Sequence, residues 1–332
     1  MPSTGPALLH RPTLRSRPSA STHVNANWKR FYLIIFFFLP LVHAHAQSLD
    51  PNRRISQYGH TAWRTQEGLV GADSVLAQTA DGYMWIWSNG HFLRFDGAQL
   101  LPWQPPKDFK WPGQTVTYLF GSRDGSLWIG TAGGLVRLKD GQLSTYSDGG
   151  ISQIIQDKSG KIWLTRYNIP KNDEALCEVD GSHLHCYGAS DGLPMQGAIA
   201  VTEDPTGMLW IVSENLSSWK PGSQARPWLN TMKHPQILAL ETDHSGDVWA
   251  TMDGAGPKFG VGYIHNGVWS EYSVPGFRSS TLLPAAIFVD RAGTVWVGTE
   301  TDGLYRLSGN TFDHFSKSDG LSGRREIGRA HV

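Results

Sequence analysis

Short runs in which apolar and polar residues alternate follow one another along most of the chain, and glycine, aspartate or asparagine bounds these runs. The alternation has the period of two that places successive side chains on opposite faces of a β-strand. The runs are rich in β-branched and aromatic residues, as in DSVLAQ, LVRLKDGQLSTY and LYRLSGNTFDHF. This pattern predicts many short strands joined by tight turns, with little helix.

One phrase recurs within this pattern: a turn, a glycine, any residue, an apolar residue and a tryptophan. Its six copies read DGYMWIWS, DGSLWIGT, SGKIWLTR, TGMLWIVS, SGDVWATM and AGTVWVGT. The repeated tryptophans are Trp85, Trp128, Trp163, Trp210, Trp249 and Trp296. Their intervals of 43, 35, 47, 39 and 47 residues fall in the range of propeller blades. The strand-like runs before and after each tryptophan make every copy a unit of four strands.

We therefore predict an all-β fold, a β-propeller of four-stranded blades over residues 61–323. Blades of a propeller pack face to face, so each repeated tryptophan is expected in the core between two blades, where its ring buries about 150–250 Å². The alternative is a ring of stacking platforms for a ligand. A strict repeat position usually reports packing, which favours the core.

The run TAWRTQEGL at 61–69 matches the fourth strand of a unit, but no first three strands precede it. Propellers commonly close by pairing such a strand with strands from the far end of the chain, which leaves no open sheet edge. Each of the six copies already has a fourth strand of its own. We therefore expect six blades of a seven-bladed ring, incomplete in this chain, with the seventh blade beginning near DGLSGRR at 319–325.

The amino-terminal region predicts export. Basic residues precede the apolar run FYLIIFFFLPLV at 31–42, and AHA at 44–46 follows it as an A-x-A cleavage site. We interpret residues 1–46 as a signal peptide and 47–60 as a linker, which places the mature protein in the periplasm or outside the cell. An uncleaved membrane anchor is the alternative, although the apolar run is short for a membrane span.

The last residues, EIGRAHV at 326–332, fit no strand pattern. They equal the in-frame translation of a widely used sequencing adapter. We interpret 324–332 as a non-native tail and the sequence as a gene fragment. Resequencing of the locus tests this hypothesis, because a natural stop codon directly after Val332 would count against it.

The charge balance excludes one class of partner. The chain has 29 basic and 29 acidic residues, and no basic stripe runs along the repeats. Nucleic acid is therefore not an expected partner.

The two cysteines of the chain, Cys177 and Cys186, flank a predicted hairpin. If Gly181 and Ser182 form its two-residue loop, the cysteines face each other at a non-hydrogen-bonded pair with close Cα atoms. This geometry suits a disulfide, which persists in an exported protein. Two free thiols are the alternative, because a shift of the register by one residue would separate the side chains.

Aromatic residues outside the repeat are the candidates for ligand contacts. The first copy reads WIWSNGHFL where the second reads WIGTAGGL, which places Trp87, Asn89 and His91 in a loop between strands. The remaining candidates lie in two long connections and are Trp103, Trp111, Trp219 and Trp228. An exposed aromatic ring beside a polar side chain suits a sugar ring or a peptide, whereas the alternative is that these rings cover strand ends.

Motifs for catalysis and for metal binding are weak. His183 and His185 face the same side of one strand, but a third metal ligand is not apparent. No G-x-S-x-G elbow is predicted, because no helix pattern follows the one matching string, GASDG at 188–192, and H-E-x-x-H does not occur. We expect no metal, no cofactor and no catalytic activity of this chain.

The run TAWRTQEGLVGADSVLAQTADGYMWIWSNGHFLRFDGAQL, with DGLP at 191–194 and DGLS at 319–322, resembles the two-component regulator propeller family. The repeat of that family is similar to G-L-P, a strand, D-x-x-G-x-L-W-I-G-T, G-L and R-F-D-G. The resemblance covers about residues 57–323. It implies the periplasmic sensor half of a bacterial histidine kinase, a hybrid two-component protein or a diguanylate cyclase, usually followed by an immunoglobulin-like domain, a membrane helix and an output domain.

The resemblance also implies a small ligand, which for some members is a carbohydrate fragment, and a homodimer of the intact receptor. Membrane attachment would come from a missing carboxy-terminal segment, because no kinase motif and no second apolar span is present. The chain departs from the family pattern at residues 87–91 and within its third and fourth copies. The alternatives are a secreted lyase or hydrolase, since streptogramin lyases have similar blades, and a free-standing secreted interaction module.

Overall fold

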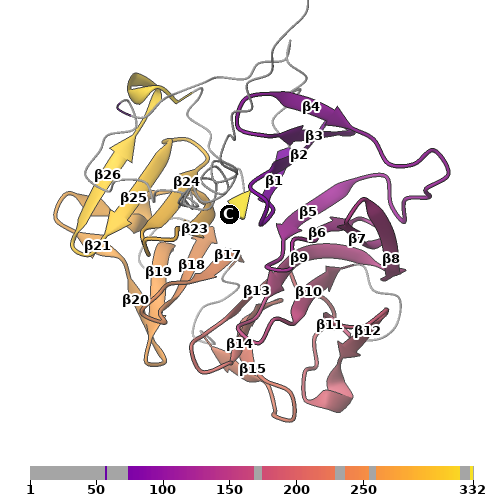
Figure 1. Cartoon of the computed structure of the whole chain (residues 1–332). Helices are drawn as coiled ribbons and strands as arrows, with labels where there is room; N and C mark the ends of the chain where they lie inside the picture. Colours follow the sequence, from indigo (N-terminus) through magenta and orange to yellow (C-terminus); the bar gives the residue numbers. More distant parts are fainter. Residues whose placement is uncertain are drawn as a thin grey trace, which may run out of the picture. The chain divides into compact units, whose positions relative to one another are not determined.

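The structure, a computed structural model, describes residues 57, 74–167, 174–228, 236–253, 259–321 and 330–331. They form six four-stranded antiparallel blades arranged in a ring, which confirms the predicted β-propeller (Figure 1). Helix in the described ranges is limited to short 3₁₀ turns, which include η4 (Ala189–Asp191), η5 (Ser279–Thr281) and η6 (Lys317–Asp319). None of the helices in these ranges has the length and apolar character of a membrane span.

Each blade consists of four strands that are consecutive in the chain and joined by hairpins. The first blade contains β1 (Ser74–Gln78), β2 (Met84–Ser88), β3 (His91–Phe95) and β4 (Leu100–Trp103). The second contains β5 (Val116–Gly121), β6 (Leu127–Thr131), β7 (Gly134–Lys139) and β8 (Gln142–Asp148). The third contains β9 (Gly150–Gln156), β10 (Ile162–Tyr167), β11 (Leu176–Asp180) and β12 (His183–Tyr187).

The later blades repeat this order. The fourth contains β13 (Ala200–Glu203), β14 (Leu209–Val212), β15 (Leu216–Trp219) and β16 (Arg226–Trp228). The fifth contains β17 (Gln236–Thr242), β18 (Val248–Asp253), β19 (Gly260–His265) and β20 (Val268–Glu271). The sixth contains β23 (Pro284–Val289), β24 (Val295–Thr299), β25 (Leu304–Ser308) and β26 (Thr311–Phe315). A small hairpin of β21 (Ser273–Val274) and β22 (Phe277–Arg278) separates the last two blades.

The carboxy-terminal tail differs from the expectation that it forms no strand. Ala330 and His331 form β27, which pairs in parallel with Leu76 and Ala77 of β1. Since β1 begins the first sheet, one of its edges is free of β2, and its backbone groups there are available to another strand. An open edge of this kind accepts a partner of almost any sequence, which is why the sequence pattern of the tail did not indicate it.

Several predictions from the ends of the chain concern residues outside the described ranges. These are the signal peptide at 1–46, the linker at 47–60 apart from Gln57, and the strand expected at 61–69. The seventh blade therefore stays a prediction.

The turn between the first two strands of a blade builds the slot of the repeated tryptophan. The glycine three residues before each of these tryptophans has a positive φ, between 79° and 99°, which glycine adopts without steric cost. In blades three to six the indole Nε1 donates to an aspartate six residues earlier, as Trp249 does to Asp243 at 2.8 Å. In the first two blades a hydroxyl replaces this carboxylate, and Trp128 donates to Ser122 at 3.0 Å.

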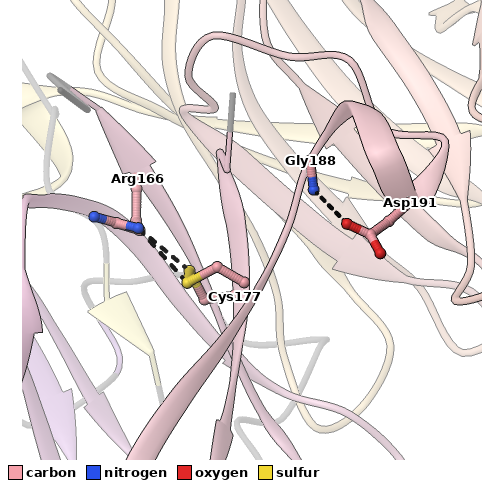
Figure 2. Close-up of a disulfide and its surroundings, with 5 residues drawn as sticks. Arg166, Cys177, Gly188 and Asp191 are labelled. Atoms are coloured by element: carbon pink, nitrogen blue, oxygen red, sulfur yellow. Dashed lines mark hydrogen bonds between the residues drawn. A yellow bond between two sulfur atoms is a disulfide. The ribbon is translucent and has the colours of Figure 1, made fainter. Parts of the chain in front are cut away.

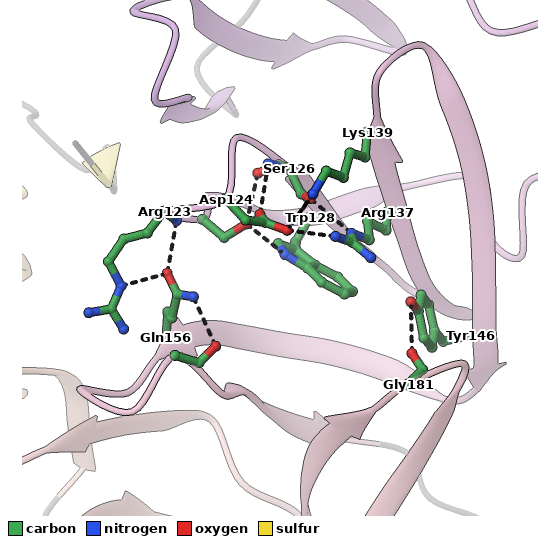
Figure 3. Close-up of polar contacts among 11 residues, drawn as sticks. Arg123, Asp124, Ser126, Trp128, Arg137, Lys139, Tyr146, Gln156 and Gly181 are labelled. Atoms are coloured by element: carbon green, nitrogen blue, oxygen red, sulfur yellow. Dashed lines mark hydrogen bonds and ion pairs between the residues drawn. The ribbon is translucent and has the colours of Figure 1, made fainter.

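Asp124 completes the slot of the second blade. Its carboxylate accepts hydrogen bonds from the hydroxyl groups of Ser122 and Ser126. It also forms ion pairs with Arg137 at 2.6 Å and with Lys139 at 3.1 Å (Figure 3). Burial alone would raise the pKa of this carboxyl, but the hydrogen bonds hold the pKa well below its ordinary value. The Arg137 guanidinium also lies 5.2 Å from the centre of the Trp128 ring, so it covers the indole as a cation–π partner.

The core lies between the blades, and each interface joins two different faces. Trp128 of the second blade packs with Ile162 and Leu164 of the third. Leu127 and Ile129 flank Trp128 and point to the other face, where they pack with Trp85 of the first blade. The tryptophan face of one blade therefore meets the aliphatic face of the next.

This arrangement accounts for the burial of the repeated tryptophans. Those that are at most 7% exposed are Trp85, Trp128, Trp163, Trp210 and Trp249. Trp296 is half-buried, since its face of the sixth blade is the one turned away from the fifth.

Candidate functional site

The hairpin between β2 and β3 begins the site. Asn89 and Gly90 have φ values of 46° and 84°, as a two-residue type I′ turn requires. Ser88 consequently pairs with His91. Trp87 and His91 therefore lie on strands, which corrects the expectation that both are in the loop. The Asn-Gly pair makes a tighter turn than the loop we had assigned.

The connection at 104–115, between β4 and β5, folds back toward this hairpin. Trp111 stacks on Phe92 of β3 with ring centres 5.5 Å apart, and Phe109 meets Trp111 edge-on at 5.1 Å. Gly113 anchors the connection on the second blade, because a Cβ there would lie 2.6 Å from the backbone nitrogen of Gly133. The two glycines allow the backbones to approach this closely.

Phe92 is the centre of an aromatic cluster. It is buried, and its ring also lies 4.7 Å from the centre of Trp87 and 5.5 Å from that of Trp103, both edge-on. The three tryptophans around it are half-buried, so each keeps part of its surface open.

These rings line a cleft of about 610 Å³ on the first blade. The side chains that give it its character are Trp87, His91, Phe92, Trp103, Gln104, Trp111 and Gln114. Of the residues that line the cleft, none is Asp, Glu, Lys or Arg. Its polar groups are the His91 imidazole, the amides of Gln104 and Gln114, the indole N–H groups and the backbone. The cleft therefore suits an uncharged ligand with flat apolar faces and with hydroxyl or amide groups.

The structure thus brings four of the predicted ligand residues into one cleft: Trp87, His91, Trp103 and Trp111. Asn89 lies in the adjoining turn, outside the lining. Phe92, Gln104 and Gln114 were missed. Phe92 follows His91 in the sequence, and Gln104 follows Trp103. Both could have been found by including the direct sequence neighbours of the predicted ligand residues.

Trp219 does not belong to a surface site, which corrects the prediction. Its side chain is 0% exposed, and its Nε1 donates to the carbonyl oxygens of Asp191 and Ser223 at 3.2 and 3.1 Å. Its ring meets Tyr187 of the third blade at 5.0 Å. It fills the interface between the third and fourth blades and presents no face to a ligand.

Trp228 lies apart from the cleft, on β16. Its half-buried ring packs 4.9 Å from Trp210, and its Nε1 donates to Ser218 at 2.7 Å. The guanidinium of Arg226 lies 4.6 Å from the ring centre. The ring therefore packs with Trp210 in the cluster between the fourth and fifth blades.

The cysteines form a disulfide on the third blade. Their sulfur atoms are 2.02 Å apart and their Cα atoms 4.0 Å apart, and Cys177 pairs with Cys186 in the register that a Gly181-Ser182 loop predicts. In the described ranges no three His, Cys, Asp or Glu side chains are grouped as metal ligands.

No family model and no curated protein matches this chain. Solved structures with a similar fold include the extracellular domain of a protein assigned as a hybrid two-component system in B. thetaiotaomicron. It is 15% identical with a TM-score of 0.65, over 80% of this chain and 38% of that chain. A second such domain from that organism is 15% identical with a TM-score of 0.58, over 77% and 38%.

Virginiamycin B lyase from Staphylococcus aureus is also similar, at 16% identity and a TM-score of 0.57, over 72% of this chain and 82% of the lyase. Identities this low show a common fold alone. The chain thus shares its propeller fold with extracellular domains of two-component systems, of which it spans less than half the length, and with a lyase.

Proposed function

We propose that this chain is an extracytoplasmic ligand-sensing propeller of a two-component signalling receptor, and that the cleft on the first blade is its ligand site. The observation that carries the proposal is the meeting of Trp87, His91, Trp103 and Trp111 in one cleft. The repeat does not require Trp87, His91 or Trp111. Trp103 also has a packing role, because it is the fourth-strand aromatic that meets the repeated tryptophan of its blade, as Tyr146 meets Trp128. Side chains that break a packing repeat and gather at one surface are typical of a binding site.

The chemistry of the cleft favours a neutral saccharide. Indole rings offer flat apolar surfaces for the C–H faces of sugar rings, and the amides of Gln104 and Gln114 can bond to hydroxyl groups. The volume of about 610 Å³ is in the range of sites for small molecules. No Asp, Glu, Lys or Arg side chain lines the cleft, so the cleft offers no permanent counter-ion to an acidic or basic ligand.

The receptor context rests on the likeness to extracellular domains of two-component systems. In this proposal the intact receptor is anchored in the inner membrane and carries its output domain elsewhere in the polypeptide. The propeller binds the ligand and performs no chemistry.

The proposal is tested by titrating the purified chain with neutral oligosaccharides while tryptophan fluorescence and binding heat are recorded. Stacking on the cleft rings should change the fluorescence, and Trp111→Ala should weaken binding at least tenfold. Trp228→Ala is the matched control, because Trp228 is also half-buried but lies away from the cleft. Absence of binding by any neutral saccharide, or equal losses in the two variants, would contradict the proposal.

A lyase is the second candidate, because the fold of the Staphylococcus aureus enzyme matches over 82% of its length. This candidate predicts that the chain acts as a lyase on virginiamycin B. Incubation followed by chromatography and tandem mass spectrometry decides between the two. A sensor leaves the compound intact, whereas an elimination within a ring changes the retention and the fragments even though the mass is unchanged.

A further inference from the structure

The disulfide of the third blade lies against a buried cation. The Nη1 atom of Arg166 is 3.7 Å from the sulfur of Cys177 and 3.6 Å from that of Cys186 (Figure 2). Arg166 is 6% exposed and Cys177 is fully buried, whereas Cys186 is half-buried on the outermost strand, β12. One guanidinium nitrogen of Arg166 therefore contacts both sulfur atoms, and it does so from the buried side of the disulfide.

The backbone fixes the position of this arginine. A bulge in the pairing of β10 with β9 falls between Thr165 and Arg166. The Arg166 N–H donates to Ala175 and its carbonyl accepts from Ala198, each at 2.9 Å. A Cβ on Gly149 would lie 2.7 Å from Nη2, so glycine at that position leaves room for the guanidinium.

A fixed positive charge affects the reduced form of this bond far more than the oxidised form. The sulfur atoms of a disulfide are neutral and accept hydrogen bonds only weakly, whereas a thiolate is an anion that a neighbouring guanidinium stabilises. Stabilisation of the reduced form makes a disulfide easier to reduce. The charge of Arg166 therefore favours reduction of this disulfide. The hairpin that the disulfide closes is also held by strand pairing within the blade.

We propose that Cys177 and Cys186 form a thiol–disulfide exchange site for low-molecular-weight thiols, with Arg166 as the positioning cation. The thiolate of the small molecule attacks the sulfur of Cys186, the more exposed of the two. The S–S bond breaks, and its electron pair stays on the sulfur of Cys177 beside Arg166. A second thiolate attacks the sulfur of the bound small molecule, which releases its disulfide and leaves Cys186 as a thiolate.

The two steps balance. Two small thiols are oxidised to one disulfide, and the protein disulfide gains two electrons. The site lies on the third blade and the aromatic cleft on the first, so the proposal is independent of the proposed ligand function. Saccharide titration of the oxidised protein does not test it.

The experiment equilibrates the folded chain in buffers of reduced and oxidised glutathione, traps the thiols by alkylation and counts them by mass spectrometry. The wild-type chain should reach a measurable equilibrium while still folded. Arg166→Met should shift that equilibrium about tenfold toward the disulfide, or about 30 mV. Arg306→Met is the matched control, since Arg306 is also 6% exposed but pairs with Asp313 in the sixth blade, and it should leave the equilibrium unchanged.

Two results would overturn the proposal. One is a wild-type disulfide that stays oxidised at every glutathione ratio until the chain unfolds, and this measurement needs no variant. The other is an equilibrium that Arg166→Met and Arg306→Met leave equal within twofold. If Arg166→Met does not fold, the wild-type equilibrium alone decides.

Discussion

The interfaces between the blades and the cleft on the first blade both depend on tryptophan, but the indole ring is enclosed at the interfaces and partly exposed in the cleft. At the interface, Trp249 is 7% exposed and its indole donates to Asp243 at 2.8 Å. In the cleft, Trp111 is half-buried and is held by the rings of Phe92 and Phe109. A ring that the next blade encloses contributes to stability, whereas a ring with a free face is available to a ligand.

Removing one ring from each region should give the largest difference. Trp249→Ala should lower the free energy of unfolding by about 3–5 kcal/mol, because it leaves a large cavity in a closed interface. Trp111→Ala should lower it by only about 1 kcal/mol, since the ring is partly in water already. Urea denaturation of both variants measures the difference, and equal losses would mean that the cleft is part of the core.

The disulfide provides an intermediate case, because Cys177 is buried in an interface while Cys186 lies on an outer strand. The double variant Cys177→Ser, Cys186→Ser should lose about 2–3 kcal/mol, as expected for a cross-link that closes a short loop. The reduced wild-type chain is the control, and its stability should lie close to that of the variant. A loss below about 0.5 kcal/mol would show that strand pairing alone holds this hairpin.

The interfaces themselves differ in the acceptor of the indole N–H. Asp243→Ala should cost about 2 kcal/mol, because it leaves the Trp249 donor buried without its charged acceptor. Ser122→Ala should cost about 1 kcal/mol, since it removes a neutral acceptor from Trp128. Thermal denaturation of the two variants side by side tests this order, and a larger loss for Ser122→Ala would reverse it.

Acid should weaken the interfaces through the same aspartates. Burial alone would raise the pKa of Asp157, Asp204 and Asp243, but hydrogen bonds from the indole, from hydroxyl groups and from the backbone lower it below the ordinary 3.8. A lowered folded-state pKa means that the stabilisation is complete above the ordinary pKa and is lost as the pH falls through the folded value.

The melting temperature should therefore vary little with these groups between pH 7 and about 5 and should fall below about pH 4. The melting temperature of the Asp243→Asn variant should fall less steeply with decreasing pH than that of the wild-type chain. Melting curves from pH 2 to pH 7 measure both slopes, and identical slopes would show that Asp243 does not contribute.

The sequence was sufficient for those parts of the fold that local chemistry decides. The period of two, the glycine before each repeated tryptophan and the Asp-Gly and Asn-Gly turns are local signals, and they identified the blades and the pairing of Cys177 with Cys186. Burial of a residue outside the repeat depends on where a connection folds. Trp219 and Trp111 therefore looked alike in sequence, although one fills an interface and the other lines the cleft.

Contacts between distant segments gave no signal of their own. The cleft exists because the connection at 104–115 lies against the second blade, and the backbone approach of Gly113 to Gly133 that fixes it is a tertiary event. Arg166 appears in the sequence as an ordinary residue of a strand. Only the bulge in β10 and the space at Gly149 bring its charge to the two sulfur atoms.

Because every described interface joins a tryptophan face to an aliphatic face, each blade has a direction around the ring. A duplicated or deleted unit would meet neighbours that already fit it, so no new core would have to evolve. Genetic recombination can thus change the number of units in such a protein while every joint keeps its chemistry. Residues at the rim of the propeller lie outside these interfaces, so substitutions there can change what the protein binds without disturbing the core.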